Sequence, residues 1–343
     1  MMPTFDSWTF ELLLPVVFMV LMGFALLVYV VLDGYDLGVG VLMGHVPDDE
    51  KDIMLASIGP FWDANETWLV LGVGLLLVAF PMAHGVVLGE LYLPVTLMLF
   101  GLILRGVAFD FRVKVSADQK PLWNRLFFMG SVLASLCQGY MLGRYITGFD
   151  SAFSAMGFSV LTAFCLLAAY VWLGASWLLM KTDGALQKKA VVWARCGAYG
   201  AGLGIVAISV ATPMLSDRIV EKWFSTPNVW YLLPIPLCTA WLFLSAHKVL
   251  GRLPSQLMQG REHGVWVPFA CAVGVLFLSF CGLAYSVFPY LVPNTVDVWQ
   301  AASHHESLLI IFWGAVAVLP AILGYTVYVY RVFWGKAKGL SYS

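Results

Sequence analysis

The stretch Gly59-Pro-Phe-Trp-Asp-Ala-Asn-Glu-Thr-Trp-Leu69 marks the point at which a polar loop of this chain enters an apolar helix. It places two carboxylates, Asp63 and Glu66, at the edge of a hydrocarbon layer, where an acid costs about 2.5–3.5 kcal/mol at the helix centre. Because residues i and i+3 share a helix face, we expect both acids to point the same way, between Trp62 and Trp68. An acid in such a place is by default a candidate for moving protons or ions.

The composition of the whole chain is that of a polytopic membrane protein. Of its 343 residues, 61% are hydrophobic and 11% are charged, whereas soluble domains carry roughly 25% charged residues. The mean hydropathy is +0.84, and fourteen Trp with fourteen Tyr suit aromatic belts at two membrane interfaces. A net charge of −1 argues against a nucleic-acid partner. We therefore expect an all-α fold in which residues 1–343 form a single integral membrane domain.

Nine stretches are apolar enough to cross a bilayer, which takes about 20 residues each. Eight spans plus one extra would allow two four-helix bundles and one peripheral helix. The third stretch carries Arg105 within it. The predicted spans cover roughly residues 12–32, 67–84, 91–111, 126–143, 152–180, 196–216, 229–246, 264–288 and 307–330.

The basic residues predict how the spans are oriented. With nine spans, one side of the membrane has only Arg144, Arg218 and Lys222. Because cytoplasmic loops are enriched in Lys and Arg, the other side is expected to be cytoplasmic, with the N-terminus outside and the C-terminus inside. That side carries fifteen basic residues: Lys51, Arg112, Lys114, Lys120, Arg125, Lys181, Lys188, Lys189, Arg195, Lys248, Arg252, Arg261, Arg331, Lys336 and Lys338.

Three polar motifs lie at the predicted cytoplasmic ends of the first three spans: Asp33-Gly-Tyr-Asp-Leu-Gly-Val-Gly40, the Gly59–Leu69 stretch, and Leu104-Arg-Gly-Val-Ala-Phe-Asp-Phe-Arg112. Gly34 and Gly38 form a Gly-x-x-x-Gly face, which lets another helix approach closely. Because the motifs share one depth, we expect their acids and two arginines to meet in one buried polar cluster.

Such a cluster suits the uptake and transfer of protons. Arg105 is its natural counter-ion, since an unpaired guanidinium inside a span is costly. The alternative, an ion-pair network that only fixes helix packing, stays open. No two histidines lie at matched depth on facing helices, so we expect no haem and no other metal site in this chain.

Four motifs together resemble subunit II of the cytochrome bd-type quinol oxidases. They are Gly34-Tyr-Asp-Leu-Gly-Val-Gly40, Gly59 to Leu69, Ala79-Phe-Pro81, and Leu102-Ile-Leu-Arg105 through Phe109-Asp-Phe-Arg112. The high hydrophobicity and the short tail resemble the cyanide-insensitive branch. One departure is Ala64, where the family usually has Gly; it adds one methyl group, and we expect function to survive it.

The resemblance implies a terminal oxidase of the bacterial inner membrane. In that family, subunit I carries two haems b and a haem d, oxidises quinol and reduces oxygen to water. Subunit II shares a pseudo-symmetric two-bundle fold, holds no haem, stabilises the complex and conducts protons from the cytoplasm. A small single-helix accessory subunit and a quinone or lipid in a lipid-facing groove are further partners that the resemblance allows.

The resemblance implies that Asp63 is the key proton relay, with Asp36 and Asp110 nearby. Glu66, which shares a helix face with Asp63, is expected to be a further relay acid. The expected structural residues, which pair ions or pack helices, are Arg105, Asp33, Trp62, Asn65, Gly34 and Gly38.

Two other functions remain open. A proton-coupled secondary transporter would use the same acids, although transporters often show broken helices and internal repeats near the midplane. Here the acids lie near one face, which counts against transport. In the other alternative, the chain is a purely structural partner subunit.

Overall fold

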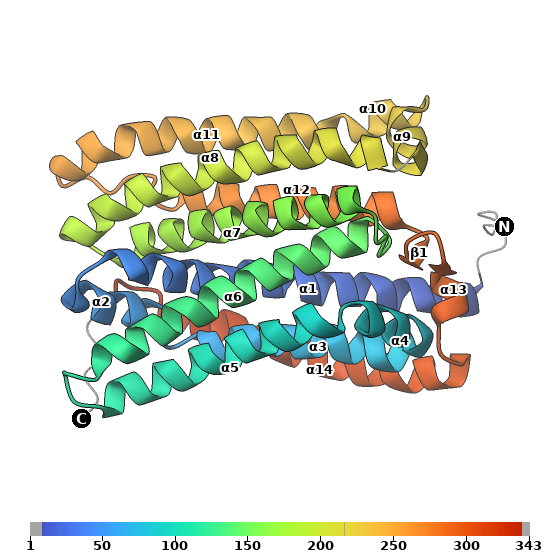
Figure 1. The fold of residues 1–343 in the computed structure, drawn as a ribbon, viewed down its shortest axis with the longest axis horizontal. Helices are drawn as coiled ribbons and strands as arrows, with labels where there is room; N and C mark the ends of the chain where they lie inside the picture. Colours follow the sequence, from blue (N-terminus) through green and yellow to red (C-terminus); the bar gives the residue numbers. More distant parts are fainter. Residues whose placement is uncertain (1–8, 216, 338–343) are drawn as a thin grey trace.

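The computed structural model describes residues 9–215 and 217–337, and this part of the chain is almost wholly helical (Figure 1). Residue 216, which lies within the span predicted over 196–216, and both chain ends are outside the described residues. The elements in chain order are α1 (Phe10–Leu42), the 3₁₀ turn η2 (Met43–His45), α2 (Asp48–Ile58), α3 (Trp62–Ala79), α4 (Pro81–Glu90), α5 (Tyr92–Lys114), α6 (Lys120–Ile146), α7 (Phe153–Lys181), α8 (Gly184–Leu215), α9 (Asp217–Phe224), α10 (Asn228–Leu232), α11 (Pro234–Met258), α12 (Val267–Val287), β1 (Tyr290–Val292), β2 (Val296–Asp297), α13 (Val298–Ala301) and α14 (His305–Val332).

The described helices confirm the expected all-α polytopic fold. Eight of them are long and apolar enough to cross a membrane, and α2 with α3 forms a further pair that is bent by 53°. The described part therefore has eight spans, or nine if the bent pair counts as one. The long helices run alternately along the long axis, so that α1 begins at one end of the molecule and α14 ends at the other (Figure 1).

The helices are arranged around α1, which packs against α3, α6 and α7. In Figure 1, α8 and α11 lie along one long edge, with α7 and α12 beside them, while α3, α5 and α14 lie along the opposite edge. The short elements α9, α10, α13 and the antiparallel pair β1–β2 gather at one end of the molecule, and α2 lies at the other end.

At two of the predicted spans the helix has other bounds, in ways that matter for the polar motifs. The first span was expected to end at residue 32, but α1 continues to Leu42, so Asp33 and Asp36 lie within the helix. The second span was expected over 67–84, but the helix starts at Trp62 and breaks at Phe80. Pro81 lacks an amide hydrogen and starts a separate helix, α4, because the first turn is the position in a helix that accepts proline at the lowest cost.

Glycines set the close approach of α1 and α7. A Cβ atom added to Gly38 would lie 1.8 Å from the carbonyl oxygen of Tyr170, and one added to Gly174 would lie 2.4 Å from the amide nitrogen of Val39. The two backbones therefore touch without intervening side chains, as small residues permit in membrane helices. This contact fixes the depth and rotation of α1 and hence of the acids that it carries.

A C-terminal strap, which we define as Phe333 to Ala337, fastens the exposed helix α14 to the end of α7. The buried Lys181 donates from Nζ to the carbonyl oxygens of Phe333 at 2.6 Å and Gly335 at 3.2 Å. In return, the amide of Ala337 donates to the carbonyl of Lys181 at 2.7 Å. Two chain segments far apart in the sequence are thus joined on the same end of the molecule.

The three basic residues at the opposite end all bond to main-chain carbonyls. Burial, followed by the nearby charge of Arg218, lowers the pKa of Lys222 to about 8. Cations stabilise helix C-termini, where carbonyls lack intrahelical partners. These hydrogen bonds to carbonyl groups therefore explain why the three cations occur at this end, although most basic residues lie at the other end. Arg144, Arg218 and Lys222 donate to the carbonyls of Phe149 at 2.8 Å, Val287 at 2.9 Å and Tyr285 at 3.0 Å, respectively.

The contact between α1 and α7 leads to a stability prediction. Gly38→Ala should lower the midpoint of thermal unfolding of the purified complex, because overpacking costs about 1–3 kcal/mol and more where backbone must move. Gly85→Ala on α4 is the matched control, since no atom lies within 4 Å of its added Cβ. A midpoint for Gly38→Ala equal to that of the control would show that α1 and α7 are not in tight contact.

Candidate functional site

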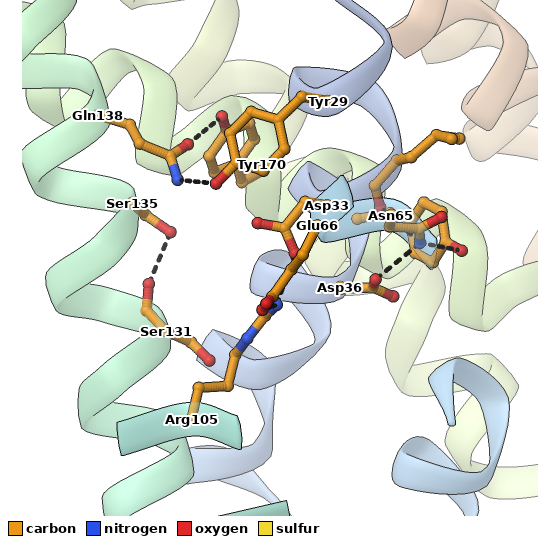
Figure 2. A network of polar contacts seen from close by, with 12 residues as sticks. Tyr29, Asp33, Asp36, Asn65, Glu66, Arg105, Ser131, Ser135, Gln138 and Tyr170 are labelled. Atoms are coloured by element: carbon orange, nitrogen blue, oxygen red, sulfur yellow. Dashed lines mark hydrogen bonds and ion pairs between the residues drawn. The ribbon is translucent and has the colours of Figure 1, made fainter. Parts of the chain in front are cut away.

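One buried arginine joins three helices. Arg105 of α5 is 1% exposed, and its Nη2 donates to Asp33 Oδ1 of α1 at 2.6 Å. The same nitrogen donates to Glu66 Oε1 of α3. Figure 2 shows the guanidinium reaching between the two carboxylates. Glu66 keeps 30% of its side chain exposed whereas Asp33 is fully buried, so the ion pairs connect the interior with the surface of the chain.

Close backbone packing also positions Arg105. A Cβ added to Gly130 of α6 would lie 2.6 Å from the carbonyl oxygen of Gly101 and 3.0 Å from the amide nitrogen of Arg105. Because α5 and α6 touch at these glycines, the stem of Arg105 leaves a fixed backbone. The Cβ that Gly34 lacks would meet the Tyr170 ring at 2.7 Å, so α1 is fixed beside Asp33 as well.

Asp36 lies in a second buried subsite, formed by α1, α3 and α14. Its Oδ2 accepts a hydrogen bond from Asn65 Nδ2 at 2.8 Å, and that nitrogen also lies 2.9 Å from the Tyr35 hydroxyl. The Tyr330 hydroxyl donates to Asn65 Oδ1 at 3.1 Å and lies 2.6 Å from the Tyr35 hydroxyl. Asn65 is thus the polar centre of this subsite and holds Asp36 in place.

A third buried group, which sequence reasoning missed, lies beside Asp33. Gln138 Nε2 donates to the Tyr29 hydroxyl at 2.7 Å, and the Tyr170 hydroxyl donates to Gln138 Oε1 at 2.6 Å (Figure 2). Both tyrosines interact electrostatically with Asp33. The one signal in the sequence was Gln138, an amide in the middle of an otherwise apolar predicted span.

The three buried groups contain more acid than base. Asp33, Asp36 and Glu66 share the single cation of Arg105, and buried ions are costly unless they are paired. Among the described residues, Asp33 Oδ2, Asp36 Oδ1 and two nitrogens of Arg105 have no hydrogen-bond partner. The arrangement therefore has free hydrogen-bonding capacity and an excess of acid, both of which suit a site that binds a proton.

Asp63 and Asp110 do not belong to this buried set. Both are exposed, Asp63 on α3 and Asp110 on α5, and the two acids interact electrostatically with each other. The expectation of one buried cluster was wrong in this respect. Asp110 follows Arg105 by five residues, a rotation of about 140° around the helix, which turns it away from the interior.

Arg112 was also expected in the cluster but lies elsewhere. It pairs with Asp52 of α2 at 2.6 Å and donates from Nε to Asn124 Oδ1 of α6 at 2.5 Å. Asn124 in turn donates to Asp48 at 3.0 Å. These contacts join α2 to the C-terminal end of α5 and the N-terminal end of α6. Seven residues separate Arg112 from Arg105, so Arg112 lies about two helical turns farther along α5.

Trp62 packs between the two sets of acids. Its ring lies 5.1 Å from that of Phe109, centroid to centroid, and a Cβ added to Gly106 would lie 3.5 Å from it. The indole therefore covers the side of α5 between the buried Arg105 and the exposed Asp110.

No metal centre is evident in the part of the chain that the structure describes. Within residues 9–215 and 217–337, no group of three or more His, Cys, Asp or Glu side chains is placed to hold a metal ion.

The fold and the site define a polytopic helical membrane protein with buried carboxyl–guanidinium pairs. The sequence model for "Cytochrome bd terminal oxidase subunit II" matches residues 14–333. The chain therefore belongs to the family of cytochrome bd oxidase subunit II, as its motifs predicted.

Relatives and a solved structure agree with this assignment. The chain is 27% identical to cytochrome bd-I ubiquinol oxidase subunit 2 of Escherichia coli K12, over 92% of this chain and 93% of the relative. It is 26% identical to cytochrome bd ubiquinol oxidase subunit 2 of Bacillus subtilis, over 88% and 90%. The fold is similar to a chain of the bd oxidase of Geobacillus thermodenitrificans, with a TM-score of 0.77, 15% identity and coverage of 94% and 98%.

The ion pairs of Arg105 predict an assembly defect on mutation. Arg105→Leu would leave Asp33 and Glu66 without their cation, and breaking a buried pair costs about 3–5 kcal/mol. We expect a several-fold lower yield of assembled complex after affinity purification, measured against total expressed chain. Arg125→Leu, which removes an exposed cation on α6, should assemble normally. Equal yields for both variants would mean that Arg105 does not hold the three helices together.

Proposed function

We propose that this chain is subunit II of a quinol:oxygen oxidoreductase of the bacterial inner membrane, where it stabilises a haem-bearing subunit I and supplies protons from the cytoplasm. Family membership supports the first part. The second part follows from chemistry, since reducing oxygen to water consumes protons as well as electrons from quinol. A membrane potential builds up only if those protons come from the cytoplasmic side.

The observation that carries the proton-uptake proposal is the position of Glu66. It is partly exposed on α3, yet it bonds to the buried Arg105, which also holds Asp33. On the exposed side of the same helices lie Asp63 and Asp110. A proton taken up by these two acids would pass to Glu66 and from there to the buried group.

The excess of acid supports proton storage at this point. If all three carboxyls were ionised, Arg105 would balance only one of them, and burying unpaired charge is costly. The lower-energy arrangement keeps a proton within the group formed by Asp33, Asp36 and Glu66. A shared proton of this kind is what a relay passes on.

The exposed acids also indicate where the partner binds. Asp63 and Asp110 lie on the outer face of membrane helices, where contact with hydrocarbon would cost an acid about 2.5–3.5 kcal/mol at the helix centre. We propose that subunit I covers this face of α3 and α5, so that the proton path runs along the interface. The two haems b and the haem d belong to subunit I in this proposal; a small single-helix subunit and a bound quinone are further components.

A purely structural role is the second candidate, because the ion pairs of Arg105 join α1, α3 and α5 whether or not a proton moves. Proton-coupled transport loses its support, since the family match covers nearly the whole chain. The structural and the proton-uptake roles differ at Asp63, which makes no hydrogen bond or ion pair within the described residues and therefore holds no helices together.

The proposed orientation places the end of the molecule that contains α2 and the C-terminus of α14 in the cytoplasm. The excess of basic residues at that end supports it. A tag after Ser343 should be accessible only from the cytoplasm, and one before Met1 only from outside, as measured by protease accessibility in oriented membrane vesicles. Both attachment points lie outside the described residues. Finding both tags on one side would contradict nine passes.

Asp63 provides the test of proton uptake. Asp63→Asn keeps the size of the side chain but removes its titratable proton. We expect normal haem content and at least a tenfold lower rate of oxygen consumption with excess quinol, equivalent to about 1.4 kcal/mol or more in barrier. Asp63→Glu should recover part of the rate, because a carboxyl group returns at a slightly shifted position.

The control is Asp49→Asn, which removes an exposed carboxylate of α2 and should turn over normally. If Asp63→Asn has normal haem and undiminished turnover, Asp63 is not a relay and the structural role remains. If haem is lost together with activity, Asp63 is needed for assembly instead.

A further inference from the structure

The buried amide of Gln138 gives the two tyrosines beside it opposite roles. Gln138 on α6, Tyr29 on α1 and Tyr170 on α7 are all buried. The Tyr170 hydroxyl donates to Gln138 Oε1, whereas the Tyr29 hydroxyl oxygen accepts a hydrogen bond from Gln138 Nε2. Each phenol carries one proton. Tyr170 therefore uses its proton on the amide, and Tyr29 keeps its own proton for another acceptor.

That acceptor is available in Asp33. Tyr29 and Asp33 are four positions apart on α1 and therefore share a helix face. The largest charge interaction of the Tyr29 hydroxyl is with Asp33, and the two groups are close enough for a hydrogen bond. Figure 2 shows the Asp33 carboxylate next to the hydroxyl groups around Gln138. Arg105 bonds to Oδ1 of this carboxylate, which leaves Oδ2 free to accept.

The neighbouring serines of α6 do not offer Asp33 a proton. Ser131 and Ser135 each donate to the main-chain carbonyl four residues earlier in their own helix. Among the hydroxyl groups of Tyr29, Tyr170 and these two serines, only that of Tyr29 has a proton without an acceptor inside the group. The hydrogen-bond inventory thus leads from Gln138 through Tyr29 to Asp33.

We propose that Tyr29 donates a hydrogen bond to Asp33 and keeps this acid ionised, and that Gln138 is the positioning residue that directs the Tyr29 proton. A carboxylate is stabilised by a nearby cation and by hydrogen bonds to its charged form. Asp33 has the cation in Arg105 and the hydrogen bond in Tyr29. The two together make Asp33 and Arg105 a fixed ion pair.

The three acids of the buried group then differ in charge. Asp36 has no cation of its own and accepts only from the Asn65 amide, and Glu66 shares the Arg105 nitrogen that Asp33 already uses. The mobile proton therefore resides on Glu66 or Asp36. This consequence rests on the proposed function, whereas the ionisation of Asp33 does not. The charged and titratable groups that face Asp33 are Tyr29 and Asp36 on α1, Glu66 on α3, Arg105 on α5 and Tyr170 on α7.

Infrared spectra of the intact, haem-containing complex test the proposal. They are recorded on the oxidised protein without quinol, as the difference between variant and wild type. Tyr29→Phe removes one hydrogen bond to a charged group, which corresponds to about tenfold or more in the proton affinity of Asp33. We expect this variant to gain a band of a protonated carboxyl group. Asp33→Asn in the same background should remove the band, and Asp36→Asn should leave it.

The matched control is Tyr170→Phe, which removes a hydroxyl from the same group but leaves Gln138 Nε2 bonded to Tyr29. Its spectrum should equal that of wild type, as should that of Tyr140→Phe, which removes a hydroxyl elsewhere on α6. If Asp33→Asn prevents assembly in the Tyr29→Phe background, ¹³C-labelled aspartate gives the second measurement. A gained band that shifts with this label and survives Asp36→Asn belongs to Asp33 by elimination among the buried acids.

Three results would overturn the proposal. The first is a Tyr29→Phe spectrum identical to that of wild type, and the second is a gained band that survives Asp33→Asn. The third is the same band in Tyr170→Phe, because Gln138 would then not decide which tyrosine donates. No quinol is oxidised in these measurements, so a failure here is distinguishable from a failure of proton uptake, which Asp63→Asn tests through turnover.

Discussion

The structure depends on a single guanidinium held inside a membrane protein. Arg105 bonds to Asp33 and Glu66, and these three residues come from three different helices. In a hydrocarbon surrounding, neither the cation nor its partners are stable alone, so the helices must meet where the charges meet. This requirement determines which faces of α1, α3 and α5 are buried. It leaves the acids on the other faces, Asp63 and Asp110, to a partner or to solvent.

The exact positions of these helices relative to one another are set by glycines and not by the charges. Gly38 and Gly174 bring α1 and α7 into backbone contact, and Gly101 and Gly130 do the same for α5 and α6. Packing of this kind gives helices a defined depth, which a flexible ion pair cannot. The ion pairs therefore determine which helices lie side by side, and the close packing at glycines determines their relative depth. The Tyr29–Gln138–Tyr170 group and Asn65 then fill the polar space that remains around Asp33 and Asp36.

Much of this could be predicted from the sequence, because the deciding signals are local. Apolar runs predicted the membrane passes, and an arginine within one of them predicted a buried counter-ion. Helix rotation was harder to predict: Asp63 and Glu66 are three residues apart, yet one is exposed and the other bonds to Arg105. Hydrogen-bond partners that lie far apart in the sequence could not be predicted. Tyr330 bonds to Asn65 across 265 residues, and Gln138 to Tyr29 across 109. No spacing rule connects residues so far apart before the helices are packed.

We propose that the acids around Arg105 hold a proton that moves during oxygen reduction. Infrared difference spectroscopy of the assembled oxidase, recorded between its reduced and oxidised states, tests this claim most directly through the carbonyl stretch of protonated carboxyl groups. We expect the wild-type complex to show such a band, and Glu66→Gln, with normal haem content, to lose or shift it. An identical band in wild type and Glu66→Gln would contradict the account, and so would the absence of any carboxyl band in the active wild-type complex.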